Sequence, residues 1–377
     1  MPKRERYVYL DLLKCIAILF VCLYHFSWAN RYSFKEIMPV KVLVHYFFWG
    51  INSVCVPVFM MVNGALLLNG KFDLRRHVLK WFSMLCGMFI WYYATLFLAL
   101  AYKHGIGYVI KNVGAIMGSI EQLTEIGGVG MTHIWFVLML LAVYIVVPVM
   151  KHAFDSGTRD AMGSLLFMGG MLYVLCIFTQ DIEHVRAYIP YLKDVDMYLT
   201  TKINPTRNDV YGAMLFYFIL GGILHRYYQR ISSTQLWMGA AVFVLGAVMH
   251  FTEWYLMTRQ LENFYDIVYF GYNCTSNILM STGLFVAAAA LCRRMNVEGC
   301  RLKHLISLIG RNTLTVYYMH WILGYTVLKM IPHGRGFGVN FVKAVGLVLV
   351  CAVAGEAATR MKAGICCRCR RLDKNSH

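Results

Sequence analysis

The sequence predicts an all-α, polytopic membrane protein with about ten transmembrane helices and both termini in the cytoplasm. Hydrophobic residues make up 59% of the 377-residue chain and charged residues 15%, whereas soluble domains average about 45–50% and about 25%. The apolar residues occur in blocks of about 20, the length at which a helix crosses a hydrocarbon core about 30 Å thick. Lys and Arg residues are also more frequent in every second connection between these apolar blocks than in the connections in between. Together these features exclude a soluble globular protein.

The expected spans leave no stretch long enough for a separate soluble domain, so we expect one domain, residues 1–377, with a basic cytoplasmic tail from about residue 360. The basic start resembles a signal peptide, but Asp11 and Lys14 interrupt the apolar run and no small-residue cleavage site follows. We interpret this segment as an uncleaved first span. The expected spans are 9–28, 42–68, 81–101, 134–150, 162–178, 211–225, 236–257, 267–291, 305–328 and 339–359.

Placing the N-terminus inside puts 21 Lys and Arg residues in cytoplasmic segments and 12 in outside connections. The positive-inside rule therefore supports the N-in, C-in topology. The net charge of +17 then reflects orientation and contact with anionic lipids, so we expect membrane lipids and no nucleic acid as partners. Two outside connections are long: residues 102–133, suited to a short re-entrant or interfacial helix or a loop, and residues 179–210, which we expect to be a hydrated loop.

Three ionisable residues lie in the first span, although each costs on the order of 2.5–3.5 kcal/mol at a bilayer centre. Asp11, Lys14 and His25 are spaced by 3 and 11 residues, which places them on one helix face. An ion pair or snorkelling would explain Asp11 and Lys14, and interhelical hydrogen bonding would explain His25. The alternative is a functional row of polar groups, with about 16 Å along the axis between Lys14 and His25.

The second span is interrupted by polar and helix-breaking residues. Pro57 removes a backbone donor and Gly64 weakens its helical turn, while Asn52, Ser53 and Asn63 add polar groups. A kinked helix that lines a polar cavity is one interpretation, and a simple packing kink is the other.

A basic segment follows directly on the expected cytoplasmic side. Arg75, Arg76 and Lys80 fit the positive-inside rule alone. They would also form a phosphate-sized basic patch if a helix beginning at Asp73 presented them to a cavity mouth.

Further polar and aromatic residues mark three later spans. His133 and Trp135 begin the fourth span at its outer interface, where both can be interfacial residues. Glu253 is deep enough in its span to need a partner. Tyr317 and His320 lie on one face of the ninth span. The twelve Cys are scattered without metal-site spacing, so we expect no metal.

Five segments, which run in order from residue 9 to residue 320, resemble acyltransferase family 3 of integral membrane acyltransferases. The family's opening motif, a basic residue and a His separated by ten residues, resembles LDLLKCIAILFVCLYH. Its second-helix Pro-Phe motif is similar to VPVFMMVNGALLL. Its His-x-Trp-Phe helix, its Gly-containing sixth helix and its late Tyr-x-His segment are similar to HIWFVLMLLAVYIVVPVM, FYFILGGILHR and IGRNTLTVYYMH. Lys14 stands where the family more often has Arg, and Asn63 where Ser is usual.

The resemblance is greatest to single-domain O-acetyltransferases of surface glycans. It implies a multi-pass protein of the bacterial inner membrane that moves an acetyl or other short acyl group from cytoplasmic acyl-CoA to a hydroxyl of a surface glycan or its lipid-linked precursor. Acetyl-CoA would be the donor substrate.

The resemblance also suggests roles for single residues. His25 would be the base, with Asp11 as a second catalytic residue, because a His can take a hydroxyl proton near neutral pH. The remaining candidates fall into a donor-binding group (Lys14, Arg75, Arg76, Lys80) and a group that orients the substrate or stabilises the oxyanion (Asn63, His133, Trp135, Glu253, Tyr317, His320).

Two other classes stay open. A proton-coupled transporter of a small polar or glycan-related substrate would also place His25, Asp11, Lys14 and Glu253 in the membrane. A membrane sensor or partner module could keep the same fold without activity. The lack of an internal repeat, which many secondary transporters have, favours the enzyme.

Overall fold

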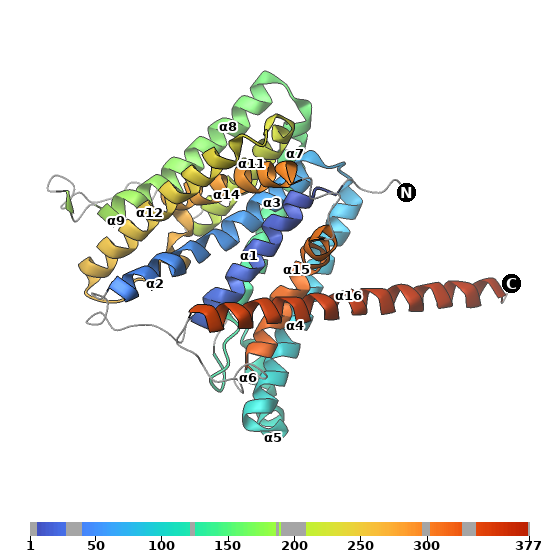
Figure 1. The fold of residues 1–377 in the computed structure, drawn as a ribbon. Helices are drawn as coiled ribbons and strands as arrows, with labels where there is room; N and C mark the ends of the chain where they lie inside the picture. The colour runs from blue at the N-terminus through green and yellow to red at the C-terminus, as the bar shows by residue number, and fades with distance from the viewer. Residues whose placement is uncertain are drawn as a thin grey trace.

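The computed structural model describes residues 6–27, 40–120, 125–185, 188–189, 209–295, 302–325 and 337–375. Over these residues the chain is helical, with one isolated bridge between Ile126 and Val129 and no strand. The all-α fold class is therefore confirmed. Figure 1 shows the helices packed as a bundle, with the end of the last helix extending away from it.

The long helices of the bundle are α1 (Val8–Ser27), α4 (Leu74–His104), α7 (Trp135–Ser156), α12 (Gln235–Leu261), α14 (Thr275–Arg294), α15 (Leu302–Tyr325) and α16 (Phe337–Asn375). The others are α2 (Val40–Gly50), α3 (Cys55–Asn69), α5 (Ile106–Lys111), α6 (Val113–Gly118), α8 (Arg159–Tyr173), α9 (Thr179–Val185), α11 (Asp209–Arg226) and α13 (Ile267–Phe270). Short 3-10 turns (η3, Ile51–Val54; η4, Thr132–Ile134; η7, Tyr228–Arg230; η8, Gly271–Asn273) and a π turn (η5, Val174–Phe178) join several of them.

Eight helical segments of the described chain are long and apolar enough to cross a membrane. They correspond to eight of the ten spans that we expected. The two others are α11, which is apolar but shorter, and α15, whose 24 residues carry more polar side chains. The expected span ends Trp28 and Leu328 lie outside the described residues.

Helix α1 lies within the bundle and packs against α15, α3, α16 and α14. Two other pairs are held at close range by glycines. A Cβ at Gly64 of α3 would overlap the backbone carbonyl of Phe218 in α11, and one at Gly221 of α11 would overlap that of Met61. Small residues let membrane helices approach this closely, since lipid supplies no hydrophobic drive for helix pairing. Gly239 and Gly283 do the same for α12 and α14.

The second span is broken, but not at Pro57. Its helix changes to a 3-10 turn at Ile51–Val54, where the Asn52 side chain donates to the carbonyl of Trp49 at 2.9 Å. Pro57 is the third residue of α3, in its first turn, and the carbonyl of Ser53, four residues before it, accepts from the Asn277 side chain at 3.1 Å. The helical break therefore lies one turn before Pro57, at the 3-10 turn.

The two long connections expected on the outer side contain short helices in their described residues. Residues 102–133 contain the two short helices α5 and α6, as the interfacial alternative allowed. Residues 179–185, expected to belong to a hydrated loop, form α9 instead, and residues 186–187 and 190–208 of that expected loop lie outside the described residues. The basic tail continues α16 as far as Asn375.

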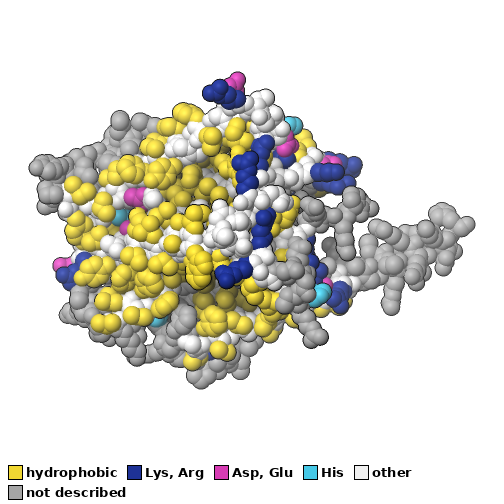
Figure 2. Space-filling view, turned by 45° about the horizontal axis from the view of Figure 1, so that its top comes forward, with side chains coloured by type: hydrophobic (Ala, Val, Ile, Leu, Met, Phe, Trp, Pro, Cys, Tyr) yellow, Lys and Arg dark blue, Asp and Glu magenta, His cyan; other side chains and the backbone are white. Residues whose placement is uncertain are grey.

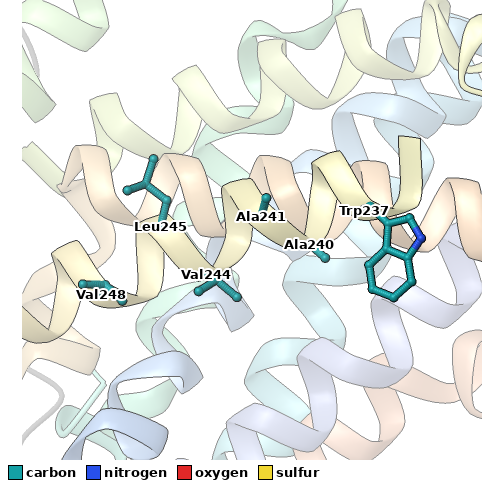
Figure 3. Close-up of a pocket in the computed structure, with 6 residues that line it drawn as sticks. All are labelled: Trp237, Ala240, Ala241, Val244, Leu245 and Val248. Carbon is teal, nitrogen blue, oxygen red and sulfur yellow. The ribbon is translucent and has the colours of Figure 1, made fainter. Parts of the chain in front are cut away.

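The surface is mostly apolar, as a lipid-facing surface must be. In Figure 2 hydrophobic side chains cover the middle of the visible face, and most Lys and Arg side chains gather toward its right-hand part. Figure 3 shows a shallow apolar groove along one side of α12. Its lining residues are Trp237, Ala240, Ala241, Val244, Leu245 and Val248.

Candidate active site

Three histidines from three different elements meet in the bundle. His25 comes from α1, His133 from η4 and His320 from α15. The ring centroid of His25 lies 5.3 Å from that of His320 and 6.4 Å from that of His133, and those of His133 and His320 are 5.5 Å apart. We call these three residues the histidine cluster.

Trp321 and Tyr317 hold the cluster in place. The indole of Trp321 stacks on the His133 ring at 4.3 Å and meets the His25 ring edge-on at 4.7 Å. Its Nε1 donates to the carbonyl of Gly130 at 2.8 Å. The Tyr317 hydroxyl donates to the backbone carbonyl of His133. These contacts connect α15 to the segment before α7, so the ring positions are set by packing between helices.

The ring nitrogens of the cluster have unused hydrogen-bonding capacity. Both nitrogens of His133 and both of His320 are buried without a hydrogen-bond partner of acceptable geometry. A buried polar group left unpaired costs about 1–3 kcal/mol. As a residue His25 is the least buried member of the cluster, since it is partly buried whereas His133 and His320 are buried. Such unpaired nitrogens are available to hydrogen-bond to a polar ligand. The cluster therefore brings together three of the site residues predicted from the sequence, His25, His133 and His320.

All three histidines belong to one end of the bundle. His25 lies in the last turn of α1, His320 near the end of α15, and His133 in the turn that begins α7. In the N-in topology, α1 and α15 run from the cytoplasm to the outside, and α7 runs from the outside to the cytoplasm. The last turn of α1, the last turns of α15 and the turn before α7 would then all lie at the outer end of the bundle.

Trp135 lies beside this end, next to aromatic residues of the connection between α12 and α14. Its ring centroid is 5.8 Å from that of Tyr269 and 5.7 Å from that of Tyr272. Burial raises the pKa of both tyrosines, so both are neutral hydroxyls near neutral pH. Trp135 is therefore part of an aromatic surface and makes no ring contact with the three histidines.

Asp11 lies at the opposite end of α1. Its carboxylate pairs with Arg6 and, at 3.0 Å, with Lys14. Lys14 also donates to the carbonyl of Gly310 in α15 at 3.2 Å. The 14 residues between Asp11 and His25 correspond to about 21 Å of helix. The shared face that we predicted exists, but Asp11 and Lys14 are not in reach of His25.

The basic residues at the start of α4 are exposed, as a phosphate-binding patch requires. The Asp73 side chain caps this helix by accepting from the Arg76 amide at 2.9 Å. Lys80 donates to the Tyr144 hydroxyl at 3.1 Å, which in turn donates to Asn63 Oδ1 at 3.1 Å. Asn63 and Lys80 are thus connected through Tyr144, which the sequence argument did not single out as a site residue.

Glu253 contacts a different set of groups. Its Oε2 accepts from Ser276 at 2.9 Å and lies 3.7 Å from His250 Nδ1 and 4.0 Å from His184 Nδ1. In the described part of the chain, His184, Glu253 and Cys274 are the group whose ligand atoms lie close enough together to hold a metal ion. Their separation in sequence hides this group from motif analysis.

The sequence profile of the acyltransferase domain of family 3 matches residues 7–357, which is nearly the whole chain. The chain belongs to acyltransferase family 3. No curated protein and no solved structure shows significant similarity to it. As a family 3 member the chain is a multi-pass membrane acyltransferase, and the match spans the helices that carry all three histidines of the cluster.

Proposed function

We propose that this family 3 acyltransferase moves an acetyl or other short acyl group from cytoplasmic acyl-CoA to a hydroxyl of a surface glycan or its lipid-linked precursor, in the inner membrane of a bacterium. The proposal rests on one observation above all. Helix α1, the turn η4 before α7, and helix α15 bring three histidines together at one end of the bundle, with ring centroids within 6.4 Å of one another. In the proposed N-in topology this is the outer end.

His25 is the proposed general base. Transfer from a thioester to a hydroxyl needs a group that takes the hydroxyl proton, and a neutral imidazole does this near neutral pH. His25 is the least buried member of the cluster, so an acceptor hydroxyl arriving from outside would meet it first. The unpaired nitrogens of His133 and His320 would donate to the thioester carbonyl oxygen as negative charge develops there.

The donor would enter from the other end. Arg75 and Arg76 would bind the phosphates of coenzyme A, because both are exposed cations at the cytoplasmic start of α4. Lys80, Tyr144 and Asn63 form a hydrogen-bonded line from that surface into the bundle. The pantetheine arm would follow this direction toward the histidine cluster.

Asp11 and Lys14 take a different proposed role. Asp11 is about 21 Å and Lys14 about 16 Å from His25 along α1, so neither touches the reacting groups in this arrangement. Their ion pair and the Lys14 bond to Gly310 hold α1 against α15, the two helices that carry His25 and His320. We therefore assign them to positioning of the cluster.

The experiment compares surface glycan from cells with the intact chain, without it, with His25→Ala and with His304→Ala. His304 is an exposed histidine at the start of α15 and serves as the matched control. Base-labile O-acetyl groups should disappear in the deletion and in His25→Ala and remain in His304→Ala. Acetyl groups that persist in His25→Ala would contradict the role of His25.

A second measurement separates the enzyme from a carrier. Purified protein should hydrolyse acetyl-CoA or transfer its acetyl group, and His25→Ala should do so at the background rate. A proton-coupled transporter would leave acetyl-CoA intact in both proteins.

A further inference from the structure

A second polar group lies in the bundle apart from the histidine cluster, and the acyl-transfer proposal makes no use of it. Its members come from three elements: His184 ends α9, Glu253 lies in the C-terminal half of α12, and Cys274 precedes α14. All three are buried, with exposed fractions of 0%, 8% and 0%. Three chemically different ligand types therefore converge from positions far apart in the sequence.

The distances between the ligand atoms suit a small tetrahedral cation. His184 Nδ1 lies 3.7 Å from Cys274 Sγ and 4.0 Å from Glu253 Oε2, and the ligand atoms of all three residues are within 4.8 Å of one another. Bond lengths to Zn²⁺ of about 2.0–2.3 Å place tetrahedral ligands about 3.3–3.6 Å apart. The His184–Cys274 pair is thus already near this spacing, and the His184–Glu253 pair would have to close by about 0.5 Å to bind such an ion.

Partners that would orient two of the ligands are already in place. The other nitrogen of His184, Nε2, lies 2.9 Å from both the Tyr265 hydroxyl and the Gln180 side-chain amide. Metal binding through Nδ1 requires the proton on Nε2, where the Tyr265 oxygen or the Gln180 amide oxygen would accept it. Glu253 Oε2 accepts from Ser276, and Ser276 Oγ lies 2.9 Å from His250 Nδ1. Such hydrogen bonds to metal-binding His and carboxylate groups fix their orientation.

The charges also favour a divalent cation. A thiolate and a carboxylate carry two negative charges, which one M²⁺ ion neutralises when the imidazole is neutral. In an apolar interior this compensation matters, because an uncompensated charge there is strongly disfavoured. The nearby Asp181 carboxyl group, which accepts from the Thr275 amide and hydroxyl, adds a further acidic group beside the proposed ion. His nitrogen, thiolate sulphur and carboxylate oxygen are together the ligand set of Zn²⁺.

We propose that His184, Glu253 and Cys274 bind one Zn²⁺ ion that ties α9, α12 and the start of α14 together. Three protein ligands leave a fourth position for water. The ion would fix the connection between α12 and α14, whose Tyr269 and Tyr272 contact Trp135. This gives Glu253 a role distinct from the substrate-orienting one expected from sequence, and it replaces the expectation of no metal.

The test measures metal content of the full chain, purified in detergent with a tag that contains no histidine. After growth with added Zn²⁺ and removal of loose metal, the wild type should hold about one Zn²⁺ per chain. Cys274→Ala should lower this to background. Cys351→Ala, which removes a buried cysteine of α16, should keep the metal, and so should a variant with Cys366, Cys367 and Cys369 changed to Ser.

Co²⁺ provides a spectroscopic readout that does not depend on activity. Wild type loaded with Co²⁺ should show thiolate-to-cobalt charge-transfer absorption, and Cys274→Ala should lack it. If Cys274→Ala does not remain monodisperse, Glu253→Gln replaces it and should lower the Zn²⁺ content. Background metal in the wild type, or metal that is lost with the tail cysteines and kept in Cys274→Ala, would overturn the proposal.

Discussion

The imidazole of His133 lies flat against the indole of Trp321, with centroids 4.3 Å apart and an angle of 26° between the rings. Because Trp321 also meets His25 edge-on, one side chain fixes two members of the histidine cluster. The geometry of the proposed site therefore depends on a residue that has no acid–base chemistry of its own.

Trp321→Ala should lower kcat/KM, since it removes the surface against which His25 and His133 are positioned. Aromatic contacts contribute about 0.5–1.5 kcal/mol beyond burial, and two are lost, so we expect a decrease of about 10- to 100-fold. Trp321→Phe, which keeps a flat ring and loses the bond to Gly130, should retain most activity. The measurement is acetyl transfer by purified variants. Equal losses in both variants would argue against positioning by ring contact.

The sequence was informative wherever a single helix carried the signal. Block length predicted the helical membrane fold, and His25 stood out because an ionisable group in an apolar span is costly. Relations between helices could not be predicted. Trp321 carries no signal that distinguishes it from an interfacial anchor, and Tyr144 is an ordinary residue of an apolar helix until Lys80 and Asn63 are seen on either side of it.

Position along a helix matters as much as residue type in two places. Pro57 lies in the first turn of α3, and the carbonyl of Ser53, four residues before it, accepts from the Asn277 side chain at 3.1 Å. Asp11 and His25 share a face of α1 but are about 21 Å apart along its axis. Neither relation can be predicted from residue type alone.

Replacement of Arg75 and Arg76 by Ala tests the donor end. If they bind coenzyme A phosphates, each single replacement should raise the KM for acetyl-CoA about 5- to 30-fold, because each charged hydrogen bond lost is worth about 1–2 kcal/mol at an exposed site. The kcat should change little, since these residues lie far from the histidines. Arg159→Ala provides the control, as Arg159 is also exposed and cytoplasmic in this topology but begins α8. A fall in kcat at constant KM would contradict the phosphate role.

Tyr144→Phe removes one hydroxyl that joins Lys80 to Asn63. The phenol is buried, so both neighbours lose a partner, and we expect the free energy of unfolding to fall by about 1–2 kcal/mol. Asn63→Ala removes the same contact from the other side. The double variant should therefore be less destabilised than the sum of the two single variants, as thermal unfolding in detergent would measure. Strict additivity would show that the two residues act independently.

Asp11→Asn should destabilise the contact between α1 and α15 more than any change at Lys14 that keeps the charge. Asp11 is 3% exposed and pairs with both Arg6 and Lys14, so its loss leaves two cations without a counter-ion. Breaking a fully buried pair costs about 3–5 kcal/mol, and partial exposure of both cations reduces the expected cost to about 1–3 kcal/mol. Lys14→Arg keeps the charge and the donors to Asp11 and Gly310, so melting temperature and activity should both be retained or raised. If Asp11 acted chemically on the substrate instead, Asp11→Asn would lose transfer activity with an unchanged melting temperature, and this pair of measurements distinguishes the two roles.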